Sequence, residues 1–499
     1  MFSKVLIANR GEIAIRVMRT CREMGIRTVA VYSDADARSR HVLEADQAVR
    51  LGPAAPSASY LRSDLILDAA RTTGAEAIHP GYGFLSENAA FAQACADAGV
   101  VFIGPPPAAM TAMGSKIGAR RLMEAAGVPV VPGETPPDQT DDALLEAIAR
   151  IGRPALVKPS SGGGGIGMRV VGPNDDAREA VQAARRDAAH AFDNGTLYVE
   201  RLVERPRHVE IQIFADAHGN CVSLFERECS IQRRHQKVME ESPSPVMTPD
   251  LRKQMGDAAV AAALACGYQN AGTVEFLVEG GDTESPRFFF LEMNTRLQVE
   301  HPITELVTGL DLVRAQLVVA AGQPLPFPLS RLAQRGHAIE LRVYAEDPAS
   351  GFLPQAGTVL LYREPDGPGI RVDSSLGEGD AVSVHYDPLL AKLIVSAETR
   401  AAALARADRA LGDFAILGIV TNIPLLRALV RHPEVQAGRI DTGLLDRLLS
   451  SLVPGTSEVP AAVAAVAAFR MGQTSASSAT GTDAPMRHDP WTSLQGRRP

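Results

Sequence analysis

The sequence predicts a multidomain protein of the α/β and α+β classes, and three observations carry that prediction. The chain has 499 residues, too many for one ordinary hydrophobic core, so roughly three domains of about 150 residues are expected. Residues 1–112 alternate apolar, strand-like segments with amphipathic, helix-like segments, which is typical of an open α/β layer. From Met113 onward, strand pairs alternate with helices, which favours a mixed arrangement.

The first domain is predicted over residues 1–112. Residues 4–9 (KVLIAN) are interpreted as a buried strand, residues 10–25 as an amphipathic helix that ends at Gly25, and residues 27–33 as the next strand. This order of elements favours an open, Rossmann-like sheet. Its first turn lacks the G-x-G-x-x-G pattern, so a dinucleotide site is not indicated.

Composition divides the rest of the chain into two domains and a tail. A proline-rich connection at residues 320–336 separates a central domain, 113–330, from a third domain, 331–447, which includes a helix at 400–414. Residues 448–499 are low in complexity and are expected to be mobile. The sequence therefore predicts three folded domains followed by a mobile tail.

The overall composition is that of a globular protein, with 45% hydrophobic and 22% charged residues. The net charge of −8 gives no general attraction for nucleic acid or anionic membranes. Five scattered cysteines form no C-x-x-C pair, which indicates a reducing compartment. No apolar run approaches the roughly 20 residues of a membrane helix, and the N-terminus has no secretory pattern, so we expect a cytoplasmic protein without a membrane partner.

Residues 288–306 (FFFLEMNTRLQVEHPITEL) alternate between polar and mostly apolar side chains. The polar positions are Glu292, Asn294, Arg296, Gln298 and Glu300. Because successive side chains of an extended chain point to opposite faces, all five would lie along one face of a strand. Such a row is either a solvated sheet surface or a functional site. Other parts of the sequence must decide between these alternatives.

Residues 271–294 are interpreted as two strands joined by a polar loop that contains glycine. Glu275 and Glu292 lie about equally far from the centre of this loop, so they are expected to face each other. Together with the amide oxygen of Asn294, they form a hard oxygen site suited to Mg²⁺ that carries nucleotide phosphates. Exposed glutamates are the alternative, but the adjacent FFF run favours a covered strand.

Residues 156–171 (LVKPSSGGGGIGMRVV) place a glycine run between two apolar segments. A flexible linker is the usual interpretation of such a run. Here the flanks look like the strands of a hairpin, which would make the glycines a mobile tip whose N–H groups close over phosphate oxygens. No Lys-Ser/Thr follows the glycines, so this is not a Walker A loop, and Lys158 precedes them instead.

The sequence has six lysines against 44 arginines, so each lysine is a candidate for an anion contact that needs a compact ammonium. Lys116 is predicted in the first turn of a helix that begins near Ser115, where an anion such as phosphate is favoured. A solvated surface lysine is the alternative. Lys116 is therefore predicted to contact phosphate.

Residues 226–245 contain a cationic cluster formed by Arg233, Arg234, His235 and Lys237. Charge runs are usually solvated faces, and adjacent glutamates argue against a nucleic-acid surface. A pocket for a small anion remains the alternative interpretation of this cluster.

Taken together, these residues closely resemble biotin carboxylase, a member of the ATP-grasp superfamily. The resemblance runs from residue 1 to about residue 447. Its motifs, in order, are IANRGEIA, HPGYGFLSEN, GPxxxxMxxMGSK, RRHQK, EMNTRLQVEHPITE and YDPLLAKL. It implies a central ATP-grasp domain with a glycine-rich lid at about residues 131–203, followed by a mixed α/β biotin carboxylase C-terminal domain.

The resemblance also implies a ligase reaction. ATP, with Mg²⁺ or Mn²⁺, phosphorylates bicarbonate to carboxyphosphate, which carboxylates N1′ of a biotin held on a lysine. The implied ATP contacts are Lys116, Lys158, His208, Gln232 and His235, with Glu200 and Val203 near the adenine and Gly163, Gly164 and Gly165 over the phosphates. The implied metal ligands are Glu275, Glu292 and Asn294.

The same resemblance assigns the chemistry to a few further residues. Arg296, Gln298 and the Val299 backbone would hold bicarbonate, and Glu300 would be the base. Lys237 would neutralise the phosphoryl group, and Arg342 would stabilise the biotin enolate. Ser161 and Ile166 depart from the family pattern of Gly and Arg in the lid, so a modest change in ATP affinity is predicted.

The expected partners follow from the resemblance and from the absence of a Met-Lys-Met sequence. Biotin would arrive on a separate biotin carboxyl carrier protein, and a carboxyltransferase would complete an acetyl-CoA or acyl-CoA carboxylase used in fatty acid biosynthesis. A homodimer is implied. The final HDPWTSLQGRRP is mildly similar to the connecting segment of long acyl-CoA carboxylase α chains. The alternatives are another ATP-grasp carboxylate ligase, or a non-catalytic regulatory subunit that binds ATP.

Overall fold

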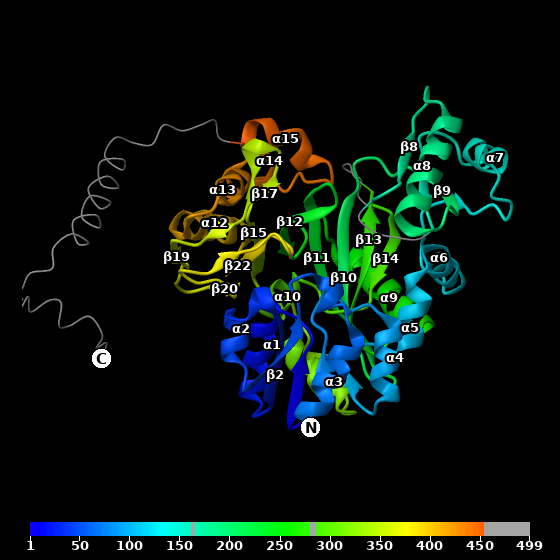
Figure 1. Cartoon of the computed structure of the whole chain (residues 1–499). Coiled ribbons are helices and arrows are strands. Elements are labelled where there is room, and N and C mark those ends of the chain that lie inside the picture. Colours follow the sequence, from blue (N-terminus) through cyan, green and yellow to red (C-terminus); the bar gives the residue numbers. More distant parts are fainter. Residues whose placement is uncertain (161–164, 280–285, 454–499) are drawn as a thin grey trace, which may run out of the picture. The chain divides into compact units, whose positions relative to one another are not determined.

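Sheets of five, eight and four strands organise the computed structural model, which describes residues 1–160, 165–279 and 286–453 (Figure 1). Residues 1–453 make up one compact unit. The mixed α/β and α+β class predicted from the sequence is confirmed. The lid residues Ser161, Gly163 and Gly164 lie outside the described residues, as do residues 454–499 of the tail expected at 448–499. Residues 448–452 of that expected tail form the end of a helix, Leu444–Leu452, in which Leu452 is buried.

The N-terminal sheet is parallel and has the strand order β3-β2-β1-β4-β5. Its strands are β1 (Lys4–Ile7), β2 (Arg27–Ser33), β3 (Gln47–Gly52), β4 (Ala77–His79) and β5 (Val101–Phe102). Its helices are α1 (Gly11–Glu23), α2 (Arg40–Glu44), α3 (Ser63–Thr73), α4 (Ala89–Asp97) and α5 (Pro107–Gly114). Val5 and Ile7 pack in one hydrophobic core and Leu6 packs in another. This is expected because successive side chains of a strand point to opposite faces, and both faces of this sheet are covered.

The central sheet has eight strands, and every adjacent pair in it is antiparallel. In spatial order the strands are β14 (Phe288–Asn294), β13 (Asn270–Val278), β10 (Arg207–Ala215), β11 (Cys221–Arg233), β12 (Gln236–Ser242), β15 (His337–Tyr344), β22 (Leu389–Ala397) and β20 (Ile370–Ser374). Because β12 pairs with β15, one sheet continues across the boundary predicted at residues 330 and 331. The predicted domain limits stay a prediction.

A smaller antiparallel sheet has the order β6-β9-β7-β8 and its own hydrophobic core. It contains β6 (Gly133–Glu134), β7 (Ala155–Pro159), β8 (Arg169–Val171) and β9 (Leu197–Arg201), with α7 (Asp141–Ile151) and α8 (Ala177–Phe192). The pairing of β7 with β8 confirms the hairpin predicted around the glycine run. This group appears at the upper right of Figure 1.

The remaining helices cover the central sheet and the C-terminal strands. They are α6 (Lys116–Ala125), α9 (Pro249–Ala265), α10 (His301–Thr308), α11 (Leu312–Ala320), α12 (Arg400–Asp413), α13 (Ile423–Arg431), α14 (Pro433–Gln436) and α15 (Leu444–Leu452). Short strands and 3-10 turns are β16 (Glu346–Asp347), β17 (Leu353–Pro354), β18 (Gly357–Thr358), β19 (Leu361–Arg363), β21 (Ala381–Val382), β23 (Ala415–Leu417), η1 (Asp34–Asp36), η2 (Pro56–Ala58), η3 (Leu329–Arg331) and η4 (Pro348–Ser350). Within the described ranges, no helix has the length and apolar character needed to cross a membrane.

The extended strand predicted over residues 288–306 ends earlier than expected. β14 stops at Asn294, and an irregular turn leads to α10. The N–H of Thr295 donates to Glu87 Oε1 at 3.0 Å, and Pro302 in the first helical turn favours a helix start here. The prediction of one extended face through Glu300 is therefore wrong beyond Asn294.

Candidate active site

Lys237 on β12 is the centre of a buried group of carboxylates from three other segments. Its ammonium lies 2.6 Å from Glu210 Oε2, 2.9 Å from Glu275 Oε1 and 2.6 Å from Glu300 Oε1. Burial opposes the charge of Lys237, but the surrounding carboxylates outweigh it and hold the pKa of the ammonium well above its usual value. The single lysine thus neutralises much of an acidic cluster.

Glu300 lies between two cations at the start of α10. Its second oxygen, Oε2, accepts a hydrogen bond from Arg342 on β15 at 3.0 Å. Burial opposes ionisation, yet Lys237 and Arg342 outweigh it and keep the pKa of Glu300 well below its ordinary value. Arg342 also donates through Nε to Glu240 Oε1 at 2.6 Å, so its guanidinium is fixed between two glutamates.

The predicted metal ligands come together on β13 and β14. Glu275 and Glu292 are direct register partners, as the sequence predicted, and Asn294 Nδ2 donates to Glu275 Oε1 at 2.8 Å. Burial and the charge of Glu275 raise the pKa of Glu292. Among the described residues Glu292 has no hydrogen-bond or ion-pair partner, and two opposed carboxylates beside an amide fit a hard divalent cation such as Mg²⁺.

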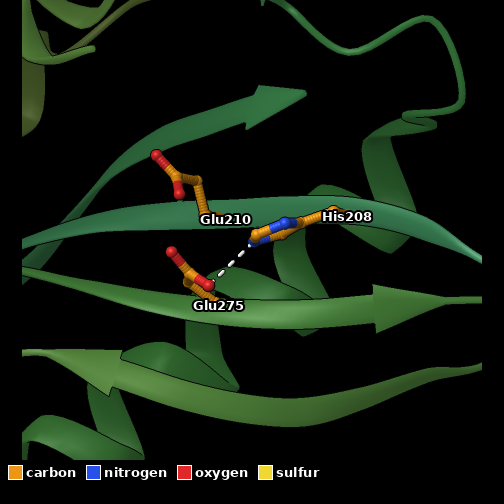
Figure 2. A group of neighbouring side chains, drawn as sticks. All are labelled: His208, Glu210 and Glu275. Carbon is orange, nitrogen blue, oxygen red and sulfur yellow. Dashed lines mark ion pairs between the residues drawn. The ribbon is translucent and has the colours of Figure 1, made fainter. Parts of the chain in front are cut away.

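His208, Glu210 and Glu275 form a second group of possible ligands, shown in Figure 2. His208 Nε2 lies 2.9 Å from Glu275 Oε2, and Glu210 is the register partner of Glu275 on β10. Lys237 already contacts both of these glutamates. Because an ammonium already occupies the space between them, the pair formed by Glu275 and Glu292 is the better place for a metal ion.

Arg296 is held by several acceptors in the turn after β14. It donates to Gln298 Oε1 at 2.7 Å, to Asn294 Oδ1 at 3.2 Å and to Glu87 Oε2 at 3.0 Å. Glu87 belongs to the N-terminal part of the chain, so this contact joins two distant segments. Gln298 Nε2 is buried and has no hydrogen-bond partner within the described part of the chain. A buried donor beside a guanidinium suits a small anion.

The predicted nucleotide lysines lie near each other. Lys158 on β7 pairs with Glu200 Oε2 at 2.8 Å, and the same glutamate accepts from Arg120 at 2.8 Å. Burial, together with the charge of Lys158, lowers the pKa of Lys116, which has no ion-pair partner among the described residues. An anion here would relieve the repulsion between the two ammonium groups.

The other predicted nucleotide contacts lie on neighbouring elements. Gln232 is buried on β11 in register with Lys237, and Val203 is buried in a small cluster with Phe289. His235 lies in the β11–β12 turn, where a Cβ on Gly165 would come within 2.4 Å of its ring. The described end of the glycine run therefore packs directly on His235.

Sequence reasoning missed several residues of this site. Glu210 and Glu87 were not singled out, nor was Arg227, whose fully buried guanidinium donates to Glu210 Oε1 at 2.5 Å. The alternation of His208, Glu210 and Gln212 with apolar residues is a signal that could have revealed the first of them. The contact between Glu87 and Arg296 has no comparable local pattern.

Comparison with known proteins agrees with this architecture. Residues 1–110 match the family "Biotin carboxylase, N-terminal domain", residues 115–327 match "Carbamoyl-phosphate synthase L chain, ATP binding domain", and residues 340–447 match "Biotin carboxylase C-terminal domain". The chain belongs to the biotin carboxylase family, a family of ligases, which confirms the resemblance drawn from the sequence.

Individual relatives support that assignment. A biotin carboxylase from Halalkalibacterium halodurans is 51% identical over 445 residues, 89% of this chain and 97% of the relative. The mitochondrial methylcrotonoyl-CoA carboxylase subunit alpha of Oryza sativa subsp. japonica is 51% identical over 456 residues, 91% of this chain and 62% of the relative. This chain thus spans less than two thirds of the length of that longer relative.

Solved structures with the same architecture carry ligands. The biotin carboxylase domain dimer of Hydrogenobacter thermophilus 2-oxoglutarate carboxylase, in complex with MgADP, ADP and bicarbonate, has a TM-score of 0.86 and 41% identity, covering 92% of this chain and all of that chain. A biotin carboxylase complex with β-γ-ATP from Campylobacter jejuni has a TM-score of 0.86 and 41% identity, covering 90% of this chain and 99% of that one.

Proposed function

We propose that this chain catalyses the ATP- and bicarbonate-dependent carboxylation of biotin, the first half-reaction of an acyl-CoA carboxylase. The observation that carries the proposal is the position of Glu300, whose buried carboxylate lies 2.6 Å from Lys237 and 3.0 Å from Arg342. Both cations keep it ionised and able to accept a proton. The ligands of the structural neighbours support this proposal.

At the nucleotide end, ATP binds between the small sheet and the central sheet in this proposal. Lys116 and Lys158 neutralise its phosphates, Glu200 and Val203 lie near the adenine, and His208, Gln232 and His235 contact the nucleotide. Gly163, Gly164 and Gly165 close over the phosphates. Glu275, Glu292 and Asn294 hold Mg²⁺ or Mn²⁺, which supplies charge neutralisation for the phosphate oxygens.

At the bicarbonate end, Arg296, Gln298 and the N–H of Val299 hold the anion, and Glu300 deprotonates it. Lys237 then faces the phosphoryl group as it passes from ATP to bicarbonate. A lysine that turns toward this group leaves Glu300 with one cation fewer, which raises its pKa and makes it a stronger base. Arg342 stabilises the enolate of biotin as its ring is carboxylated.

The partners proposed for this activity are a biotin carboxyl carrier protein and carboxyltransferase subunits. The relatives include subunits of methylcrotonoyl-CoA carboxylase and of pyruvate carboxylase as well as biotin carboxylase. Of these acceptor classes we propose an acyl-CoA, and acetyl-CoA, the acceptor in fatty acid biosynthesis, is the first to assay. The dimer named for the Hydrogenobacter thermophilus domain supports a homodimer. A cytoplasmic location remains part of the proposal, although several relatives are named as mitochondrial.

The proposed domain limits are 1–112, 113–330 and 331–447, with the lid at about 131–203. The small sheet, from Gly133 to Arg201, supports the proposed lid, and the family matches support the division into three.

The experiment that tests the function measures bicarbonate-dependent ATP hydrolysis and its stimulation by free biotin. Glu300→Gln should abolish that activity while nucleotide affinity, measured by calorimetry, stays within about twofold. Glu364→Gln is the matched control, because Glu364 is exposed and accepts from the Tyr362 hydroxyl rather than from a residue of this site. Full activity in Glu300→Gln would overturn the assignment of the base.

The wild-type protein separates the two rival functions in the same assay. Hydrolysis that depends on a different carboxylate, and not on bicarbonate, would point to another ATP-grasp ligase. Nucleotide binding without any turnover would point to a regulatory subunit.

A further inference from the structure

Lys392 on β22 is a fully buried cation that no step proposed above uses. Its ammonium donates to the backbone carbonyl oxygen of Val299 at 2.9 Å. Glu12 Oε1 lies 3.2 Å away and Asp373 Oδ2 3.8 Å away. Burying an ammonium is costly unless opposite charges and acceptors compensate it, and these two carboxylates and one carbonyl do so.

Each of these contacts comes from a different part of the chain. Glu12 lies on α1 beside the N-terminal sheet, Val299 lies in the turn that follows β14, and Asp373 is the register partner of Lys392 on β20. The lysine therefore joins the turn to two rigid elements. A charge-assisted hydrogen bond of this kind fixes a position more strongly than a bond between neutral groups.

The sheet register places Lys392 next to a residue of the reaction site. Arg342 on β15 is its direct partner across β15 and β22. Arg342 holds the carboxylate of Glu300 at 3.0 Å, while Lys392 holds the carbonyl of the preceding residue, Val299. Two adjacent cations of one sheet thus fix two consecutive residues of one turn.

The carbonyl that Lys392 holds belongs to the peptide group that joins Val299 to Glu300. Because a peptide group is planar, a fixed oxygen also fixes the directions of the N–H and Cα of Glu300, the atoms from which its side chain is built. It restricts rotation about the bond between Cα and the carbonyl carbon of Val299 as well. This contact thus restricts the orientation of the Val299 N–H, while Lys237 and Arg342 hold the Glu300 carboxylate.

We propose that Lys392 is a positioning residue for bicarbonate, acting through the backbone of Val299. The inference rests on the proposed function, in which the Val299 N–H contacts bicarbonate and Glu300 takes its proton. Without Lys392 the turn samples other orientations, and the anion loses a well-placed donor and a well-placed base together. The nucleotide contacts on β7, β11 and α6 are not held by Lys392, so ATP binding is unaffected.

The test is steady-state kinetics of Lys392→Met, which keeps the length of the side chain and removes its charge. The KM for bicarbonate should rise about tenfold or more, as expected for the loss of a hydrogen bond to a charged donor, while the KM for ATP changes less than about twofold. Calorimetry of nucleotide binding gives an independent check that the ATP site is intact. A bicarbonate KM within about twofold of wild type would overturn the inference.

Glu12→Gln is the matched control, because it removes one charge around Lys392 but keeps the contact with Val299. Its bicarbonate KM should stay near the wild-type value, and an increase as large as that of Lys392→Met would show that domain packing, not the Val299 contact, is responsible. If Lys392→Met does not fold, the double variant Glu12→Gln/Lys392→Met removes both charges together. It should likewise raise the KM for bicarbonate and leave the KM for ATP nearly unchanged. A wild-type enzyme without bicarbonate dependence would refute the proposed function instead.

Discussion

Glu275 and Glu292 face each other across β13 and β14, and their pKa values are shifted in opposite directions. Burial opposes the charge of Glu275, but Lys237 and His208 outweigh it and lower the pKa. Burial and the charge of Glu275 raise the pKa of Glu292. The pair is therefore a repulsive contact that a divalent cation would convert into an attractive one.

Replacing Glu292 with Gln should weaken metal binding and stabilise the metal-free protein. The affinity for Mn²⁺ with nucleotide present should fall about tenfold or more, measured by electron paramagnetic resonance titration. Because the folded pKa of Glu292 is raised, its contribution to stability is lost as pH rises above the ordinary carboxyl value, so the variant should melt higher than wild type at neutral pH. Glu364→Gln is the control, and unchanged Mn²⁺ affinity contradicts the metal assignment.

Glu240 should make the stability of the protein depend on pH. Burial raises the pKa of this carboxyl to about 7, although Arg342 acts in the opposite direction. The stability that it contributes is complete below the ordinary carboxyl pKa and is lost as pH rises through about 7, at about 1 kcal/mol per pH unit. Urea unfolding of Glu240→Gln between about pH 5 and 8 should show a shallower decline than wild type. Parallel curves for the two proteins would contradict this pKa shift.

Lys116 should matter for ATP far more than another lysine on a helix. Its lowered pKa comes from burial and from Lys158, so a phosphate that binds here relieves a repulsion. Lys116→Gln should raise the KM for ATP about tenfold. Lys253 is the control, because it is exposed and its one ion pair within the described part of the chain is with Asp257, one helical turn away. Lys253→Gln should leave the KM for ATP unchanged. Equal effects of the two substitutions would contradict the phosphate assignment.

The resemblance to biotin carboxylase implies an arginine in the lid where this chain has Ile166, whose side chain is 54% exposed. Ile166→Arg should lower the KM for ATP modestly, about two- to fivefold, by adding a cation near the phosphates. Val170→Arg is the matched control, because it places the same charge at a similarly exposed position on β8. An unchanged KM in Ile166→Arg would show that the position contributes nothing to phosphate binding.

Features that depend on neighbouring residues in the sequence could be predicted from the sequence. The cross-strand pairing of Glu275 with Glu292 followed from their distances to one loop. The helix start predicted near Ser115 is confirmed, and in the structure the Ser115 side chain caps that helix by accepting from the Gly118 N–H at 3.2 Å. Both depend on neighbours a few residues away.

Contacts between segments that are far apart in the sequence could not be predicted from a local pattern. Glu87 and Arg296 are 209 residues apart, and Lys392 and Val299 are 93 apart, so no period in the sequence relates either pair. The alternation of polar and apolar residues from Glu292 to Glu300 was misleading as evidence for a strand. After β14 ends at Asn294, a turn and the start of α10 bring the later polar residues to the same site. The functional roles of the site residues remain predictions that rest on the resemblance.

The continuous eight-stranded sheet determines where this chain can be recombined with its relatives. In a chimaera joined between residues 330 and 337, β12 would come from one parent protein and β15 from the other, although the two strands pair directly. The contact between Glu240 and Arg342 would then form only if the two parents were compatible along these strands. The segment from Gly133 to Arg201, which contains the small sheet, has its own hydrophobic core, so it is the better unit for exchange between relatives. Exchanging this segment would alter the proposed nucleotide contacts of Lys158 and Glu200, while the carboxylate cluster around Lys237 would keep its present residues.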